Sequence, residues 1–164
     1  IVMQNDFLFS DTILENIRFG REISQDDIEK AIQISQAYDF IMSFPEGLNH
    51  VLSQKATNIS GGQKQRLLIA RALANHPEIL ILDDSSSALD YKTDANLRKA
   101  ILQNLKDTTS IIVTQRVSSV MNADLIIVLE EGEIIGMGNH RDLLNTCEAY
   151  KEISESQIGG SFID

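Results

Sequence analysis

The sequence predicts an α/β fold, in which part of a parallel β-sheet carries flanking helices and is joined to a helical subdomain. Two observations predict it. From Gly61 onward, short apolar runs of strand length alternate with helical patterns, the order expected when helices connect parallel strands. Before Asn58, the apolar residues recur at helical spacing instead. The boundary between the two parts is therefore expected near Asn58–Ser60.

Three short helices are predicted in the N-terminal part. Ser10 or Asp11 is expected to cap the first helix, which ends before Gly20. Ser24 is followed three residues later by an acid, a pattern that resembles a capping box and begins the second helix. The third helix covers Tyr38–Ser43. A turn and an aperiodic loop close this part, at Pro45–Gly47 and His50–Asn58.

The remainder of the chain is predicted to alternate between helices and strands. Its first helix is rich in good helix formers and ends before Pro77, and the continuously apolar run that follows is typical of a strand buried on both faces. The last two strands flank a tight turn and should form an antiparallel hairpin at an edge. The predicted elements are a helix at Gln63–Asn75, a strand at Glu78–Asp83, a helix from Asp90 to Leu105, a strand at Ser110–Thr114, a short helix at Val117–Met121, strands at Leu125–Leu129 and Glu133–Met137, and two C-terminal helices.

Composition and charge narrow the classes of partner. The formal net charge of -10 at pH 7 argues against nucleic acid or an anionic membrane surface, because both are polyanions. The single cysteine, Cys147, excludes an intrachain disulfide and fits a reducing compartment. No apolar run approaches the roughly 20 residues that cross a bilayer, and no signal peptide is recognisable. Because the chain opens on Ile1 within an apparent strand, we expect it to be a piece of a longer protein.

The run Ser60-Gly61-Gly62-Gln63 stands directly before a predicted helix. Glycine lets a ligand approach the backbone closely, and the first helical turn has free N–H groups at the positive end of the helix dipole. Such a site suits a phosphate group. The alternative is structural, with Ser60 as a helix cap and the glycines as a hinge.

Two acids, Asp83 and Asp84, follow the apolar strand that begins at Ile79. They stand at the carboxyl edge of a predicted parallel sheet, the edge at which ligands bind in such sheets. An aspartate there can hold Mg²⁺ beside the phosphates of a nucleotide. The alternative is a pair of surface acids that begin a loop.

Taken together, these motifs resemble the ATPase domain of ABC transporters, of the exporter type. The resemblance rests on ISGGQKQR at 59–66, ILILDD at 79–84, SALD at 87–90 and QNDFLFSDTILENIRFG at 4–20, in that order and spacing. It covers essentially the whole chain, from the Q-loop of that domain to its C-terminus. It implies a partial sheet of the P-loop NTPase type, preceded in the complete domain by a phosphate-binding loop that this chain does not contain.

The resemblance also implies roles for particular residues. Gln4 matches the Q-loop glutamine, which senses Mg²⁺ and the γ-phosphate, and Asp83 matches the Mg²⁺ ligand. Ser60–Gln63 match the signature, which contacts ATP bound on a partner domain. Ser87–Asp90 match the D-loop at the interface between the two domains, with Asp90 near the nucleotide, and Asn5–Phe9 would face the coupling helices of the membrane part.

Three positions depart from the pattern of active family members. Asp84 stands where they have a catalytic glutamate, and a carboxylate one methylene shorter is displaced from the water that a base must reach within about 3 Å. Gln115 stands where a switch histidine is expected, and an amide cannot shuttle a proton at pH 7. Gln54 replaces an acid in the loop Leu52–Ala56. The first two losses at one catalytic site resemble the degenerate half of a heterodimeric multidrug-type exporter.

The expected organisation follows from this resemblance. ATP and Mg²⁺ are the expected cofactors; the expected partners are a second ATPase domain, arranged head to tail, and the transmembrane domains of a transporter. The complete protein should lie at the cytoplasmic face of the plasma membrane, whereas the fragment alone should be soluble and inactive. The expected segments are the Q-loop segment at 1–9, the helical subdomain at 10–60, the α/β core portion at 61–139 and the C-terminal helices at 140–164.

Two other functions remain open on the sequence alone. A soluble ABC protein acting on chromosomes or ribosomes is the first, although the long heptad repeats or second cassette of such proteins are not seen here. The second is a regulatory domain that binds a nucleotide without turning it over, which the residues Asp84 and Gln115 favour.

Overall fold

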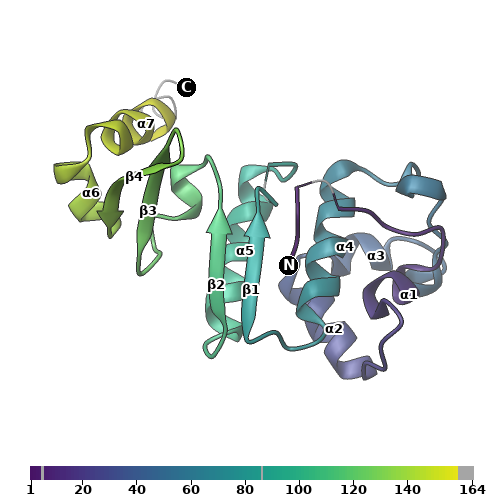
Figure 1. Cartoon of the computed structure of the whole chain (residues 1–164). Helices are drawn as coiled ribbons and strands as arrows, with labels where there is room; N and C mark the ends of the chain where they lie inside the picture. Colours follow the sequence, from purple (N-terminus) through teal and green to yellow (C-terminus); the bar gives the residue numbers. More distant parts are fainter. Residues whose placement is uncertain (5, 86, 159–164) are drawn as a thin grey trace. The chain divides into compact units, whose positions relative to one another are not determined.

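The computed structural model describes residues 1–4, 6–85 and 87–158, and these form an α/β protein, as predicted. The chain divides into two compact units, Ile1–Val113 and Thr114–Asp164, which are described one at a time (Figure 1). The sequence analysis divides the chain more finely, into segments 1–9, 10–60, 61–139 and 140–164, and this division stays a prediction. Asn5 and the last six residues, which belong to the predicted first and last segments, lie outside the described residues.

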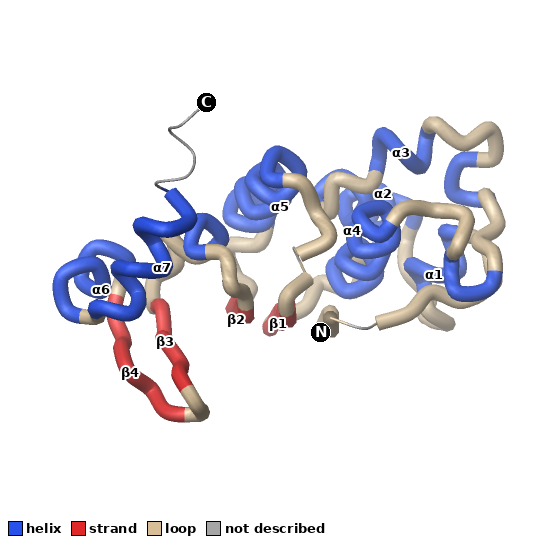
Figure 2. The backbone as a smooth tube through the Cα atoms, turned by 90° about the horizontal axis from the view of Figure 1, so that it is seen from above, coloured by secondary structure: helices blue, strands red, loops and turns tan. Residues whose placement is uncertain are grey.

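The first unit begins with a helical part that ends in the long helix α4. Helix α4 packs against both α1 and α2 (Figure 2), and Leu67, Ile69 and Ala70 on it are fully buried. Its apolar stripe therefore forms the centre of the main core. The helical elements are α1 (Ile13–Arg18), α2 (Gln25–Ile34), α3 (Tyr38–Met42), the 3-10 turns η1 (Gly47–Asn49) and η2 (Gln54–Ala56), and α4 (Gly61–Leu73).

Two local predictions for this part were wrong. The cap of α1 is Thr12, whose hydroxyl accepts the N–H of Glu15 at 3.1 Å, and not Ser10 or Asp11. The stretch 50–58 is not only loop, because Val51 forms an antiparallel bridge with Thr12 and η2 follows it. The cap of α2 is confirmed: Ser24 accepts the N–H of Asp27 at 3.1 Å.

A parallel strand pair completes the first unit. β1 (Ile79–Asp83) and β2 (Thr109–Val113) pair from Ile79 opposite Thr109 to Asp83 opposite Val113, and helix α5 (Tyr91–Asn104) connects them. The chain start runs along the other side of β1, where Val2 forms a parallel bridge with Leu82 (Figure 1). β1 therefore has backbone partners on both of its edges.

The second unit consists of a hairpin and two helices. β3 (Ile126–Glu130) and β4 (Glu133–Gly138) are antiparallel, as predicted, and pack with α6 (His140–Thr146) and α7 (Glu148–Ile158). The helix predicted at Val117–Met121 is only a 3-10 turn, η3 (Val117–Ser119). The core of the second unit is small and is formed by Val117, Ile126, Leu143, Cys147 and Tyr150. Within the described parts of both units, no helix has the length and apolarity required to cross a membrane.

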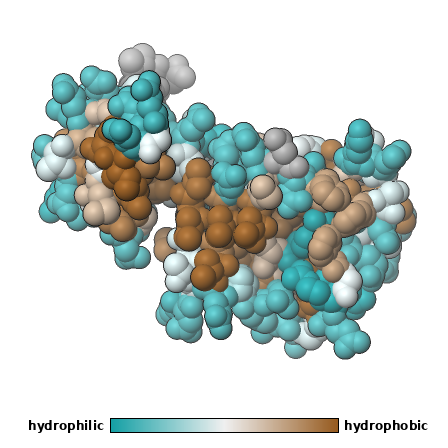
Figure 3. All heavy atoms as spheres, viewed as in Figure 1, coloured by the Kyte–Doolittle hydropathy of each residue, from teal (hydrophilic) through white to brown (hydrophobic). Residues whose placement is uncertain are grey.

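Both units expose apolar side chains along their strands. Figure 3 shows brown surfaces over β1 and β2 and over the hairpin of the second unit. In the first unit these include Ile79 and Ile111, which are 57% and 48% exposed. In the second, Leu129 and Met137 are 66% and 64% exposed. Such surfaces usually lie against other parts of a protein.

We expect the isolated chain to associate or to bind the dye ANS, because strand edges and apolar faces are uncovered in it. Size exclusion with light scattering, followed by dye fluorescence, measures both properties. Replacing the exposed Ile111 by lysine should weaken the dye signal, whereas lysine at the exposed but polar Asn104 should not. A wild-type chain that elutes as a monomer and leaves the dye dark would contradict this expectation.

Candidate nucleotide-binding site

Strand β1 ends in the two acids that the sequence singles out. Asp83 is the last residue of β1, and its N–H donates to the carbonyl of Val2 at 2.9 Å. The N–H of Asp84 donates to the carbonyl of Val113 at 2.9 Å, and its φ is 44°. A positive φ turns the backbone out of the extended conformation of the strand. Both acids therefore stand at the carboxyl edge of the parallel pair, where a loop begins.

Gln4 reaches the same edge of the sheet, although it is 80 residues away from Asp84 in the sequence. Its Nε2 donates a hydrogen bond to Oδ2 of Asp84 at 3.1 Å. The bridge between Val2 and Leu82 explains this position, because it aligns the chain start with β1 and delivers Gln4 beyond the strand end. The structure thus brings together Gln4, Asp83 and Asp84.

The signature residues form the first turn of α4. Ser60 is the N-cap: its hydroxyl accepts the N–H of Gln63 at 3.2 Å, and its own N–H donates to Oε1 of Gln63 at 2.9 Å. This is a complete capping box. The helix begins at Gly61 and not at Gln63 as predicted. The exposed Ser60 and Gly61 therefore lie at the end of a 13-residue helix, where backbone N–H groups and the helix dipole favour an anion.

The signature lies against the predicted D-loop of the same chain. A Cβ atom built on Gly62 would lie 3.0 Å from the carbonyl oxygen of Ala88 and 3.7 Å from Leu89. The same construction at Gly61 meets nothing nearer than Cβ of Ala88 at 4.0 Å. Gly62 is thus required for close backbone packing, whereas Gly61 has room on this side.

Asp90 is engaged within its own helix. It caps α5, where Oδ1 accepts the N–H of Thr93 at 2.9 Å and Oδ2 accepts the Thr93 hydroxyl at 2.7 Å. These hydrogen bonds from Thr93 lower the pKa of the Asp90 carboxyl. Both carboxylate oxygens of Asp90 therefore accept hydrogen bonds within the cap. A contact of Asp90 with a nucleotide stays a prediction.

Gln115 belongs to the second unit. Its carbonyl oxygen accepts a hydrogen bond from Nε2 of Gln157 at 2.7 Å, and its side chain is exposed. Gln157 also accepts the N–H of Val117 at 2.9 Å. Helix α7 therefore fixes the backbone around the position at which the switch residue is expected.

The donor set at the end of β1 fits Mg²⁺ held beside phosphates. Among residues 1–4, 6–85 and 87–158, no group of three or more His, Cys, Asp or Glu side chains could hold a metal by itself. Mg²⁺ in nucleotide sites needs only one or two protein oxygens, with phosphate and water as the other ligands. Asp83 offers a carboxylate, and Gln4 offers its amide oxygen because the amide nitrogen is directed to Asp84.

Two arginines hold α4: Arg71, which the sequence analysis missed, and Arg66, for which a solvated helix face was predicted, wrongly. Arg71 is 9% exposed and donates to the carbonyl oxygens of Asn16 and Phe7 at 2.9 and 3.0 Å. Burial lowers the pKa of its guanidinium, and the charge of Asp6 opposes this shift. Arg66 donates to the carbonyl oxygen of Gln36 at 2.7 Å. The sequence signal for Arg71 was a cation within an otherwise apolar stripe.

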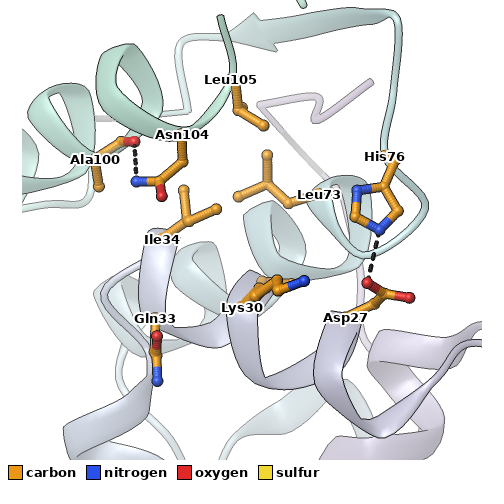
Figure 4. Close-up of a pocket in the computed structure, with 10 residues that line it drawn as sticks. Asp27, Lys30, Gln33, Ile34, Leu73, His76, Ala100, Asn104 and Leu105 are labelled. Carbon is orange, nitrogen blue, oxygen red and sulfur yellow. Dashed lines mark hydrogen bonds and ion pairs between the residues drawn. The ribbon is translucent and has the colours of Figure 1, made fainter.

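A pocket of about 240 Å³ lies away from all these residues, near the opposite end of α4 (Figure 4). Two of its lining residues are joined by a hydrogen bond, in which Nε2 of His76 lies 2.8 Å from Oδ1 of Asp27. Hydrogen bonds from Ser24 and then His76 lower the pKa of Asp27. The pocket contains none of the predicted site residues; it is lined by Asp27, Lys30, Ala31, Gln33, Ile34, Leu73, His76, Ala100, Asn104 and Leu105.

Comparisons with known proteins agree with this geometry. The model of the ABC transporter family matches residues 1–87. An uncharacterised ABC transporter ATP-binding protein of Bacillus subtilis, YfiB, is 48% identical over 159 residues, which is 96% of this chain and 27% of that protein. A candidate multidrug export ATP-binding/permease protein of Staphylococcus aureus is 41% identical over 158 residues, with the same two coverages.

A solved structure supports the same relationship. A bacterial Atm1-family ABC exporter with ATP bound superposes with a TM-score of 0.90 at 34% identity, covering 96% of this chain and 28% of that one. The chain spans about a quarter of the length of the curated relatives it matches. Because the family model covers 87 of the 164 residues and the fold agrees, this chain belongs to the ABC transporter family.

Proposed function

We propose that this chain is the C-terminal portion of a nucleotide-binding domain of an ABC exporter. In the complete protein it would couple ATP binding and hydrolysis to the transport of a substrate across a membrane. Its signature would complete the ATP site of a second, head-to-tail domain, while its own catalytic site is degenerate. The portion by itself would not hydrolyse ATP, because the loop that cradles the β- and γ-phosphates is not among its residues.

The observation that carries this proposal is the start of α4. Ser60 and Gly61 are exposed there, the capping box orders the first turn, and Gly62 lies against the backbone of Ala88. The free N–H groups therefore face outward from a rigid support, as binding of a phosphate on another domain requires. Of the predicted nucleotide-binding residues, Gly61 and Gly62 would offer their backbone N–H groups. Ser60 and Gln63, whose N–H groups are used in the capping box, would hold this turn in place.

The contact between Gln4 and Asp84 supports the proposal that the chain's own catalytic site is degenerate. The Asp84 carboxylate is shorter than a glutamate, and its Oδ2 already accepts a hydrogen bond from Gln4. An oxygen engaged in this way is less available to accept a proton from an attacking water, which a general base must reach within about 3 Å. Gln115, at the switch position, cannot take up a proton at pH 7.

Gln4 and Asp83 would hold Mg²⁺, which would neutralise charge on the phosphates of ATP bound to this chain. The exposed rings of Phe7, Phe9 and Phe19 would contact the membrane part, and the whole assembly would lie at the cytoplasmic face of a membrane. A second candidate function, nucleotide binding without turnover, is favoured for this half-site by the same contact between Gln4 and Asp84.

We expect Asp84→Asn to change the turnover of the full-length transporter by less than about threefold, whereas loss of a working base costs about 10²–10⁴. Steady-state ATPase assays on the purified transporter give the comparison. The matched control is the residue that corresponds to Asp84 on the partner domain, whose amide variant should be inactive. If Asp84→Asn is the crippling change, Asp84 is the base and the degenerate-site proposal is wrong.

A further inference from the structure

Arg71 lies in the second half of α4 and binds one particular segment of the chain. Its Nε donates to the carbonyl oxygen of Asn16 at 2.9 Å, its Nη1 to the carbonyl oxygen of Phe7 at 3.0 Å, and its Nη2 to Oδ1 of Asn16 at 3.2 Å. All three nitrogens of the guanidinium are therefore used on the segment 7–16. A planar fork with this number of donors fixes the relative orientation of what it joins.

Asn16 extends this connection to the backbone of Phe9. The Asn16 side chain is 1% exposed. Its Oδ1 accepts the N–H of Phe9 at 2.8 Å, and its Nδ2 donates to the carbonyl oxygens of Phe9 and Thr12, both at 3.0 Å. Both polar backbone groups of Phe9 are thus bound by a side chain that Arg71 itself holds. Buried polar groups of this kind are strongly held, because a broken bond leaves an unpaired group.

An exposed aromatic patch is formed by Phe7 and Phe9 of this segment together with Phe19, the C-cap of α1. These rings are 57%, 44% and 50% exposed, and their centroids lie 5.1 Å apart for Phe7 and Phe9 and 5.5 Å apart for Phe9 and Phe19. The Arg71 guanidinium carbon lies 4.7 Å from the centroid of Phe19 and 5.7 Å from that of Phe9. The same buried cation therefore supports both the backbone and the rings of the patch.

The other end of the same helix carries the signature. A helix rises about 1.5 Å per residue, so Gly62 and Arg71 are about 14 Å apart along one rigid element. Arg66, between them, has other contacts: it donates to the carbonyl oxygens of Gln36 and of Gly62, at 2.7 and 3.2 Å, and lies 4.6 Å from the ring centroid of Phe40. Arg71 is thus the arginine of α4 that connects the patch to the helix.

We propose that Arg71 is a positioning residue that makes the aromatic patch and the signature end of α4 move as one body. Contact of the membrane part with the patch would then set the position of Ser60 and Gly62 against the ATP of the partner domain. This inference rests on the proposed function, and it assigns a regulatory role to a residue that touches neither nucleotide nor membrane part.

A double-mutant cycle in the full-length transporter tests this role. Phe7 offers Arg71 only its carbonyl oxygen, so Phe7→Ala removes the ring from the patch and leaves that hydrogen bond intact. We expect Arg71→Lys and Phe7→Ala each to lower kcat for Mg-ATP about tenfold with KM within about twofold, and the double variant to be no more than about twofold below the lower single variant. The two changes break the same connection, so their effects should not multiply.

The matched control is Arg66→Lys with Phe7→Ala, for which the effects on kcat should multiply. Thermal unfolding is measured on every variant, and a merely structural role would make the loss of kcat follow the loss of stability in both cycles. Asn16→Asp provides a second route, because it keeps the acceptor for Arg71 and loses the three hydrogen bonds that Nδ2 donates, to the carbonyl oxygens of Phe9, Asp11 and Thr12. When Asn16→Asp is combined with Phe7→Ala, the effects of the two changes on kcat should also fail to multiply.

The two proposals can fail separately. If Ser60→Arg leaves ATP hydrolysis intact, the signature does not act on a partner site, and the proposed function and this inference are both wrong. If Ser60→Arg is inactive while the effects of Arg71→Lys and Phe7→Ala multiply, the proposed function stands and the role of Arg71 is wrong.

Discussion

Gly62→Asp is expected to lower ATP hydrolysis by the full-length transporter by about 100-fold or more, the size of effect seen when a preorganised donor to a transferring group is lost. Two causes act together. A Cβ at this position would lie 3.0 Å from the carbonyl oxygen of Ala88, so the first turn of α4 would have to shift. In the proposed head-to-tail arrangement, the carboxylate would also place a negative charge beside the phosphates of ATP on the partner domain. Steady-state ATPase assays measure the loss.

Two companion variants separate these causes. Gly62→Ala keeps the crowding and adds no charge, so it should lose less activity than Gly62→Asp. Ser60→Arg leaves Gly62 in place and adds bulk at the cap, and it should also abolish most turnover. Normal hydrolysis in Gly62→Asp, with the variant protein folded, would mean that the start of α4 does not face a nucleotide.

Gly136→Ala is expected to destabilise the second unit by about 1–3 kcal/mol, the usual cost of overpacking. A Cβ on Gly136 would lie 2.9 Å from Sγ and 3.1 Å from Cβ of Cys147, and 3.1 Å from Cδ2 of Leu143. Cys147 and Leu143 are themselves buried, so neither can easily move away. Chemical denaturation gives the free energy of unfolding of each variant and thus the loss of stability. A loss of this size is large for a unit with so small a core.

A second substitution provides the control. Cys147→Ala removes the sulfur that the new methyl group would meet, so the double variant should be more stable than Gly136→Ala alone. The gain should be absent when Cys147→Ala is combined with Gly132→Ala, because nothing lies within 4 Å of a Cβ on Gly132. Additive effects in the Gly136 pair would show that the contact with Cys147 does not limit this position.

The sequence predicted best where the deciding interactions are local. The cap at Ser24 and the antiparallel hairpin were right, because each depends on residues a few positions apart. The cap of α1 was wrong because Ser10, Asp11 and Thr12 are all capable of capping. The choice is made by the pairing of Thr12 with Val51, which lies 39 residues away and is not visible in a local pattern.

The same limit applies to the site. The motifs predicted which residues belong to the site. The structure brings Gln4 to Asp84 through a strand-like pairing that no spacing in the sequence reveals. Arg71 was missed for a related reason. Its partners are backbone carbonyl oxygens of Phe7 and Asn16, and a backbone acceptor leaves no trace in residue type.

The pairing of Val2 with Leu82 also bears on the order of folding. It closes a loop as long as that between Gln4 and Asp84, which are 80 residues apart. Closing such a loop carries an entropic cost that grows with the logarithm of its length, and contacts of large sequence separation form slowly. The helices α1 to α4 can assemble through nearer contacts first. We therefore expect Gln4 and Asp84 to come together among the last features of the first unit to form, after helix α4.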